Sequence, residues 1–128
     1  MTLSIGTPSK ILDNKTAAAA GTTALADCTA IDMDAAITLG LEVLCTYGSA
    51  ATLAGTLKVF ASYDGMNYDT DPVEQFDLPF TANTAKSQTF SVSSSARYLK
   101  GQIINNESSG SNKDMTACYI YTHKQVVS

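Results

Sequence analysis

The stretch ITLGLEVLCTY, residues 37–47, alternates apolar and polar side chains over eleven positions. Its odd-numbered positions are all apolar or aromatic, whereas its even-numbered positions are mostly small or polar. Successive side chains of a β-strand point to opposite faces, so this period of two predicts a strand with one buried face.

The segments after this strand repeat the pattern. Residues 57–63 alternate in the same way, with Phe60 as an apolar exception on the polar face, and further strands are expected over residues 73–80, 86–92, 97–105 and 115–122. Pro72 and Pro79 predict that the strand between them is an edge strand or an irregular one. Gly101, inside a strand, is expected to mark a bulge.

Turn residues separate these strands at a spacing of roughly ten residues, and no helical period is sustained, which predicts an all-β fold built as an antiparallel β-sandwich. A jelly roll is the preferred form, because the strands are short, the loops vary and nothing repeats. An immunoglobulin-like sandwich is the second choice, since its hallmark is a buried Trp and the chain has no Trp.

The first 35 residues differ from the rest of the chain, because Ala and Thr dominate them. The four alanines at 17–20 offer little apolar area to hold a helix down, and Gly21 ends the run. We therefore expect residues 1–35 to form an extended arm with one or two short strands, lying along its own domain or reaching a neighbour. Residues 36–128 are expected to form the sandwich.

The composition limits the classes of function. A chain of 128 residues fits one domain, and its 16% of charged residues is well below the usual quarter, so we expect a surface rich in hydroxyl groups. Such a surface loses little side-chain entropy when a partner covers it. The net charge of −4 argues against direct binding to nucleic acid. No apolar stretch approaches a membrane span and no signal peptide is recognisable, so we expect a protein made in the cytosol that binds no membrane.

The segment SYDGMNYDTDP, residues 62–72, holds the candidate site. The site residues are Asp64, Gly65, Asn67, Tyr68, Asp69 and Asp71. An EF-hand loop needs acidic groups at positions one, three and five, Gly at six and Glu at twelve. Counted from Asn67, position six is Pro72, and counted from Asp64, position three is Met66, so the template fails in both registers. A looser calcium cage made from the acidic and amide members of the set stays open as an alternative.

A turn between two strands accounts for more of these residues than a calcium cage does. Asp64 and Gly65 directly after an alternating strand are a strong turn signal, because Gly tolerates positive φ and the Asp carboxylate can accept hydrogen bonds from nearby amides. Asp71 before Pro72 sets the direction in which the chain leaves. Tyr68 is then the residue that we expect to contact a partner.

The remaining reactive residues indicate neither catalysis nor a metal centre. Cys28, Cys45 and Cys118 form no CxxC pair and the chain has one His, which argues against zinc. We expect buried free thiols, with a bridge between Cys45 and Cys118 as the alternative. His123 is expected to be exposed on the last strand, since no sequence signature marks a nucleophile for it. We expect no catalytic residues, no cofactor and no metal.

Two segments, LKVFASYDGMNYDTDPVEQFDL (57–78) and ARYLKGQIINNESSGSNKDMTACYIYTH (96–123), carry a resemblance. Within residues 37–124 the chain resembles small virion proteins of tailed bacteriophages. The resemblance implies a non-enzymatic structural protein in the virion, a β-sandwich that decorates or cements the capsid or a related domain on the tail. Its implied partners are the major capsid protein or other virion proteins, and it implies a homo-oligomer, with a trimer favoured. It carries no catalytic residues.

The N-terminal arm, residues 1–35, is then expected to make the contact with a neighbouring subunit or with the capsid. The alternative from another class is a carbohydrate-binding module, in which the loop from Asp64 to Asp71 holds calcium and a glycan. A third hypothesis is a hydrolase that uses His123, but the sequence indicates no substrate for it.

Overall fold

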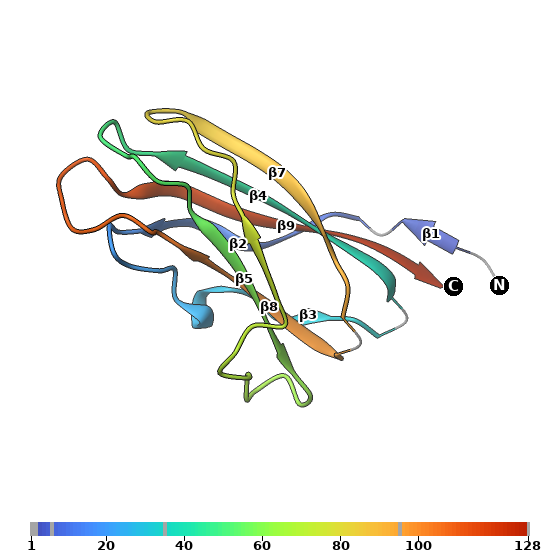
Figure 1. Cartoon of the computed structure of the whole chain (residues 1–128). Helices are drawn as coiled ribbons and strands as arrows, with labels where there is room; N and C mark the ends of the chain where they lie inside the picture. The colour runs from blue at the N-terminus through green and yellow to red at the C-terminus, as the bar shows by residue number, and fades with distance from the viewer. Residues whose placement is uncertain (1–2, 6, 35, 95, 128) are drawn as a thin grey trace.

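The computed structural model describes residues 3–5, 7–34, 36–94 and 96–127 (Figure 1). Within these residues the strands are β1 (Leu3–Ile5), β2 (Ser9–Ala17), β3 (Ile31–Asp32), β4 (Ala36–Tyr47), β5 (Thr56–Ser62), β6 (Glu74–Asp77), β7 (Ala85–Val92), β8 (Tyr98–Ile104) and β9 (Met115–Val127). One 3-10 turn, η1, covers Leu25–Asp27. No helix of the described part is long and apolar enough to cross a membrane.

The strands form two antiparallel sheets that stack on each other. Sheet A has the order β1-β9-β4-β7, with β2 also paired to β9, and sheet B has the order β3-β8-β5-β6. Figure 1 shows β4, β7 and β9 together in one layer, and β5, β6 and β8 belong to the other. The predicted antiparallel β-sandwich is confirmed.

The pairing within the two sheets is nested. Strand β2 pairs with β9, β3 with β8, β4 with β7, and β5 with β6. The chain therefore resembles one long hairpin whose tip is the β5–β6 connection, rolled so that successive strands mostly alternate between the sheets. This is the arrangement of a jelly roll, the preferred form of the sandwich.

The core lies between the sheets and follows the alternation of the sequence. In β4 the inward side chains run from Leu39 to Tyr47, and each is at most 2% exposed. The side chain of Ile37, expected on the same face, lies outside the described residues. Sheet B contributes the fully buried Leu57, Leu99 and Ile103. Burial of large apolar side chains is the main source of stability for such a sandwich.

The same core extends across the expected boundary at residue 35. Strand β2 pairs along β9, and Leu12, Cys28 and Ile31 are buried in the same core cluster. The segment from β2 to β3 therefore lies along its own domain, because its apolar side chains help to close the core. The alanine run forms a turn in which Ala20 has φ 61° and the Gly21 amide donates to the Ala18 carbonyl.

The expectation of a bulge at Gly101 is wrong. Strands β5 and β8 pair without a register shift from Thr56↔Ile104 to Ser62↔Tyr98. A Cβ at Gly101 would lie 3.0 Å from the Ile120 side chain, so the glycine makes room for a residue of the opposite sheet. Register shifts occur instead in the pairing of β9 with β2 and with β4. The strand after Pro72 is an edge strand, β6, as predicted.

Candidate functional site

The sandwich has two ends with different character. The loop end holds the β2–β3, β4–β5, β6–β7 and β8–β9 connections, and the groove end holds the β3–β4, β5–β6 and β7–β8 connections. In Figure 1 the green, yellow and red loops at the upper left belong to the loop end, and the β5–β6 connection hangs from the groove end. The candidate site predicted from the sequence lies in that connection.

Asp64 organises the first half of the β5–β6 connection. Its Oδ1 accepts hydrogen bonds from the amides of Met66 and Asn67, both at 2.9 Å, and its Oδ2 accepts one from Asn67 Nδ2 at 2.8 Å. The Ser62 hydroxyl also donates to Asp64 Oδ1. The following Gly65 has φ 79°, a backbone conformation that favours glycine. The hydrogen bonds from Asn67 and Met66 hold the pKa of the Asp64 carboxyl well below its usual range.

Tyr68 lies against the body of the sandwich. Its ring is half-buried beneath Lys100, whose Nζ is 5.0 Å from the ring centroid. Its hydroxyl is buried and has no hydrogen-bond partner among the described residues. Burial raises the pKa of this phenol, so the group stays neutral. Tyr68 is therefore packed more as a structural residue than as an exposed contact residue.

Two large apolar or aromatic side chains of this connection project into solvent. Tyr63 and Met66 are each 84% exposed, whereas Asp69 donates its amide to the Ala61 carbonyl at 2.9 Å and leaves its carboxylate in solvent. The alternation placed Tyr63 on the inner face with Ala61. The strand ends at Ser62, however, and the turn directs the next side chain outward. The sequence signal for this is the Asp64–Gly65 pair itself.

The acidic side chains of this connection were the candidates for a calcium cage. Among the described residues, no three His, Cys, Asp or Glu side chains gather closely enough to hold a metal ion. Both carboxylate oxygens of Asp64 accept hydrogen bonds within the turn. Asp71 is exposed.

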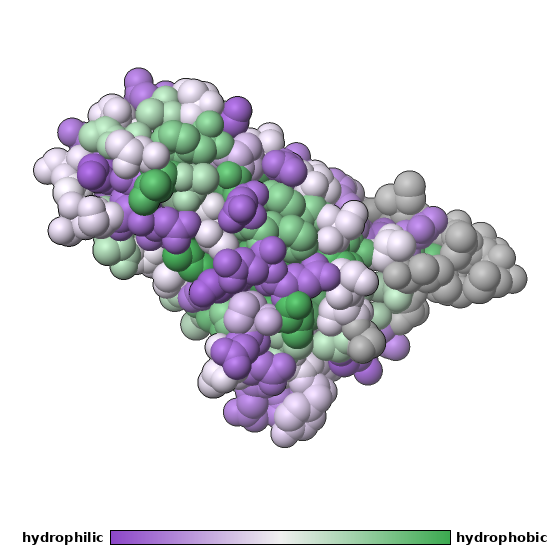
Figure 2. All heavy atoms as spheres, in the orientation of Figure 1, coloured by the Kyte–Doolittle hydropathy of each residue, from purple (hydrophilic) through white to green (hydrophobic). Residues whose placement is uncertain are grey.

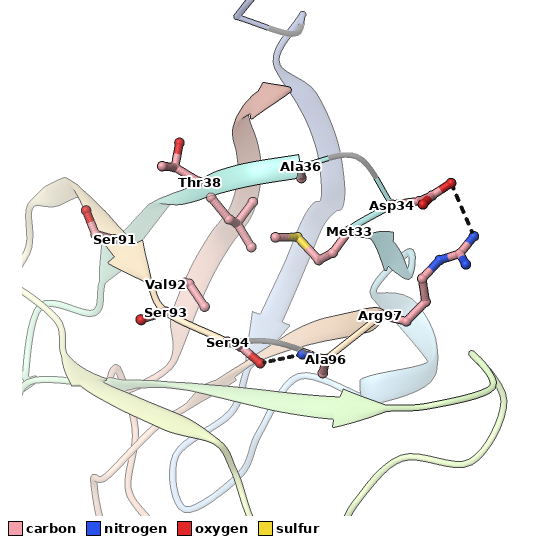
Figure 3. Close-up of a pocket in the computed structure, with 11 residues that line it drawn as sticks. Met33, Asp34, Ala36, Thr38, Ser91, Val92, Ser93, Ser94, Ala96 and Arg97 are labelled. Atoms are coloured by element: carbon pink, nitrogen blue, oxygen red, sulfur yellow. Dashed lines mark hydrogen bonds and ion pairs between the residues drawn. The ribbon is translucent and has the colours of Figure 1, made fainter. Parts of the chain in front are cut away.

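A groove of about 750 Å³ opens beside this connection (Figure 3). It forms where β7 leaves sheet A: the pairing of β4 with β7 ends at Leu39↔Val92, whereas β4 continues back to Ala36 with β9 on its other side. Apolar atoms come from Met33, Leu39, Val92 and two alanines, and hydroxyl groups come from Thr38, Ser91, Ser93 and Ser94. The first residues of β4 therefore border the groove on the side where a neighbouring strand would lie.

Arg97 closes the groove on one side. Its Nε donates to Asp32 Oδ1 at 2.6 Å, and its Nη2 donates to Asp32 Oδ2 at 3.2 Å. The same Nη2 lies 3.8 Å from Asp34 Oδ2. The hydrogen bond from Arg97, together with the Asp34 amide, lowers the pKa of Asp32 to about 2. A smaller hollow of about 410 Å³ shares Arg97 and reaches Tyr63 and Asp69, so the predicted loop and the groove adjoin.

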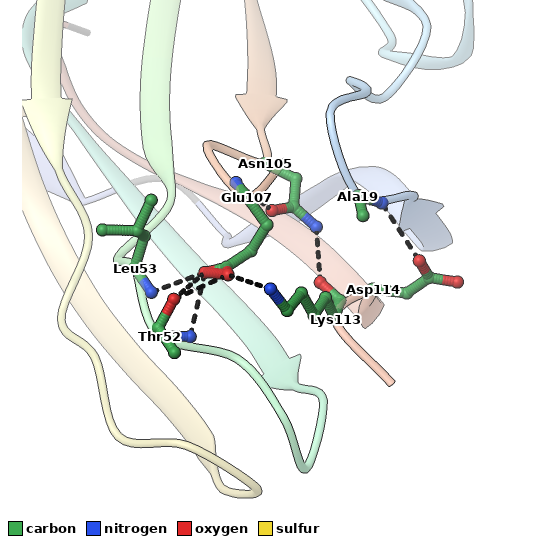
Figure 4. A network of polar contacts seen from close by, with 7 residues as sticks. All are labelled: Ala19, Thr52, Leu53, Asn105, Glu107, Lys113 and Asp114. Atoms are coloured by element: carbon green, nitrogen blue, oxygen red, sulfur yellow. Dashed lines mark hydrogen bonds and ion pairs between the residues drawn. The ribbon is translucent and has the colours of Figure 1, made fainter. Parts of the chain in front are cut away.

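The loop end is held by a network of side chains that the sequence did not indicate (Figure 4). The Glu107 carboxylate, 3% exposed, accepts hydrogen bonds from the amides of Thr52 and Leu53 and from the Thr52 hydroxyl, with Lys113 Nζ at 3.9 Å. Burial raises the pKa of this group, but the hydrogen bonds from Thr52 and Leu53 and the charge of Lys113 outweigh it, so the pKa lies below its usual range.

Asn105 extends this network to the N-terminal segment. Its Nδ2 donates to the Ala17 carbonyl at 3.0 Å and to the Lys113 carbonyl at 2.8 Å, and its Oδ1 accepts from the Glu107 amide. Asp114 Oδ1 accepts from the Ala19 amide at 3.0 Å. Three loops that are distant in sequence are thus joined by hydrogen bonds to backbone groups, which fixes their relative positions.

The cysteines are buried and free. Burial raises the pKa of Cys45 to about 11 and that of Cys118 to about 12, so both remain protonated near neutral pH. Cys28 Sγ accepts a hydrogen bond from the Gly101 amide at 3.4 Å, and burial raises its pKa. His123 is half-exposed on β9, with its Nε2 3.2 Å from Glu42 Oε1.

Comparisons with known proteins place the chain in no family. No family model matches it, and no curated protein matches it. A chain from a solved structure described as "Bacillus endospore appendages form a novel family of disulfide-linked pili" is similar at 17% sequence identity and a TM-score of 0.46, over 100% of this chain and 93% of that chain. A likeness at this level carries no functional conclusion for the present protein.

Proposed function

We propose that this chain is a non-enzymatic structural protein of a bacteriophage virion, a decoration protein that binds the head shell. The resemblance of residues 37–124 to small virion proteins of tailed phages motivates the proposal. The observation that carries it is the contrast between the strands from β2 onward, which supply the described core residues, and the short strand β1 at the edge of sheet A. Strand β1 pairs with Gln125–Val127, at the far end of β9 (Figure 1).

This contrast narrows the segment proposed to reach the shell. Residues 9–34 take part in the fold through β2, η1 and β3, so the contact is now assigned to residues 1–8. Several copies of such a segment on each particle raise its effective affinity for the shell.

The surface of the sandwich also supports the proposal. In the view of Figure 2, hydrophobic atoms form several small areas separated by weakly polar and hydrophilic atoms. Few long charged side chains lie on this surface, because only 20 of the 128 residues are Lys, Arg, Asp or Glu. A surface of short polar side chains suits close and lasting contact with a protein lattice.

The test is deletion of residues 1–8 followed by binding to capsid shells assembled without this protein. We expect occupancy of the shell to be lost while the melting temperature of the isolated protein stays close to that of the wild type, because β2–β9 pairing and the core are retained. A variant in which residues 1–8 are replaced by Gly and Ser controls for length. Unchanged occupancy in both variants would contradict the proposal.

The purified protein also allows a test of the carbohydrate-binding alternative. A melting temperature that rises with calcium, or binding to a glycan array that a chelator abolishes, would favour that alternative over the decoration protein. We expect neither response.

A further inference from the structure

The two sheets present lateral edges that differ in how well they are protected. An exposed strand edge offers unpaired N–H and C=O groups to other chains, and proteins blunt such edges with short strands, charges, prolines or bulges. In sheet B the edges are β3, with two residues, and β6, with four. Neither is long enough to pair extensively with another chain.

The β2 edge of sheet A is long but interrupted. Its pairing with β9 shifts register three times, and Asn14 has φ 51°. Lys10, Asp13 and Lys15 add charges along its nine residues. Bulges and charges of this kind prevent a second strand from pairing along β2.

The β7 edge of sheet A is the least protected of the edges compared, with no bulge and one charge. All eight residues of β7 pair with β4 in continuous register, from Thr46↔Ala85 to Leu39↔Val92. The strand, AKSQTFSV, contains no Pro and one charged residue, Lys86. In the sheet order of the described residues, β4 is the only neighbour of β7. A long, regular and nearly uncharged edge is therefore open along one side of the molecule.

We propose that β7 pairs antiparallel with β7 of a second copy of this chain, about a twofold axis, so that sheet A continues from one subunit into the other. A twofold contact uses the same patch on both subunits and must be self-complementary. A twofold axis normal to the sheet runs the two copies of the strand in opposite directions. The pairing is therefore centred on one residue, which lies opposite the same residue of the second copy. The centres that use most of the strand are Gln88 and Thr89.

The side chains of β7 are self-complementary in both registers. Phe90 and Val92 face the core, and the intervening Ser87, Thr89 and Ser91 are exposed on the outer face. A centre at Thr89 places Thr89 opposite Thr89 and Ser87 opposite Ser91, whereas a centre at Gln88 places Ser87 opposite Thr89. Hydroxyl pairs of this kind are favourable cross-strand neighbours.

The distribution of charge also favours a second copy of the chain as the partner of the β7 edge. In either register Lys86 lies opposite an apolar residue, and the Lys86 of the second copy is at least four residues, or about 13 Å, further along the strand. That distance exceeds the screening length of about 8 Å at physiological ionic strength. No like charges therefore oppose each other across this edge.

The experiment measures the mass of the purified protein in solution by light scattering after gel filtration. We expect a species of twice the 13.5 kDa chain mass whose fraction grows with concentration, together with concentration-dependent protection of residues 85–92 from hydrogen exchange. The double variant S87K/T89K places lysines directly opposite one another in both registers, so we expect it to weaken the dimer by about tenfold or more.

A matched control carries the same substitutions on the other edge. Ser9 and Thr16 of β2 are exposed, and S9K/T16K should leave the dimer intact. Mixing S87K/T89K with S87E/T89E should restore association, which a variant that fails to fold would not do. A wild-type protein that is monomeric at all concentrations, or a dimer that S87K/T89K leaves unchanged while it remains folded, would overturn the proposal.

The inference is independent of the proposed decoration role. Dimerisation through β7 is measured on the isolated protein, whereas the decoration role is measured by occupancy of a shell, so each can fail alone. A trimer, which the phage resemblance favours, would need a head-to-tail contact, and its mass in the same experiment would count against the twofold pairing.

Discussion

The loop end and the groove end are made from the same strands, but they differ in how completely their buried polar groups are hydrogen-bonded. At the loop end, Glu107, Asn105 and Asp114 bind backbone groups of other loops, so the connections are fixed to one another. At the groove end, two buried oxygens, Tyr68 Oη and Glu74 Oε2, have no partner among the described residues, and the sheets leave a groove. Buried polar groups without partners cost free energy. Stability is therefore concentrated at the end of the sandwich away from the groove.

The largest effect is expected at Gly48, which joins three loops of the loop end. A Cβ at this position would lie 2.2 Å from the Asn112 carbonyl oxygen, and the Gly48 amide and carbonyl bind Asp114 and Asn83. Gly48→Ala forces these loops apart, so we expect a loss of about 3 kcal/mol in the free energy of unfolding. Chemical denaturation measures it.

Gly65→Ala is the matched control at the groove end. Its φ of 79° is unfavourable for Ala, but the nearest heavy atoms to a Cβ, in the Tyr98 ring, lie at an ordinary 3.5 Å. We expect a smaller loss of about 1 kcal/mol, from backbone strain alone. Equal losses for the two variants would mean that the ends are equally rigid.

The next effect in size is expected for Glu107→Gln, which removes the charge but keeps the shape of the side chain. The carboxylate only accepts hydrogen bonds here, so the Gln amide nitrogen would face another donor, and we expect a lower melting temperature. The folded-state pKa of Glu107 is below its usual value, so its contribution is complete above about pH 4.3 and is lost as pH falls through the lower folded value.

The pH dependence gives the control for this variant. The melting temperature of the wild type should fall as pH drops below about 4.3, and Glu107→Gln should flatten part of that fall. Asp32, whose pKa is about 2, should contribute at lower pH in both proteins. An unchanged acid profile in Glu107→Gln would show that the network does not hold the loop end.

The smallest effects compare two tyrosine hydroxyls, one at each end. Tyr47 Oη accepts a hydrogen bond from the buried Gly55 amide at 3.1 Å, so Tyr47→Phe should cost about 1 kcal/mol. The hydroxyl of Tyr68 has no hydrogen-bond partner in the described part of the chain, so Tyr68→Phe should leave stability unchanged or raise it slightly, while the ring still packs under Lys100. Thermal unfolding of both variants measures the difference. A clear loss for Tyr68→Phe would mean that its hydroxyl is satisfied.

The strands of the sandwich were predictable because their signal is local. The alternation in residues 37–47 and 57–63 predicts β4 and β5 to within one residue of their observed ends. The turn chemistry of Asp64 and Gly65 is equally local, since Asp64 binds groups within three residues. A period of two and a Gly after an Asp need no knowledge of the rest of the fold.

The features that the sequence did not reveal depend on distant contacts. Glu107 meets Thr52, 55 residues away, and a lone Glu in a Ser-rich loop has no local signature of burial. Strand β2 was expected in an arm because Ala and Thr dominate residues 1–35. The register shifts that fit β2 to β9 leave no regular alternation in its sequence that could have marked it as a core strand. Gly101 was expected to mark a bulge, whereas a glycine is needed at this position to leave room for the Ile120 side chain across the core.

The nested pairing of the strands has a consequence for the order in which the chain folds. Strands β5 and β6 are close in sequence, so joining them closes a short loop, whereas Ser9 and Thr122 are separated by 113 residues. The entropy lost in closing a loop rises with its length, and folds rich in distant contacts fold slowly. The Asp64–Gly65 turn thus lies in the connection between the two paired strands that are nearest in sequence, and the other strand pairs join residues that are further apart. The pairing of β1 and β2 with β9 joins the most distant residues.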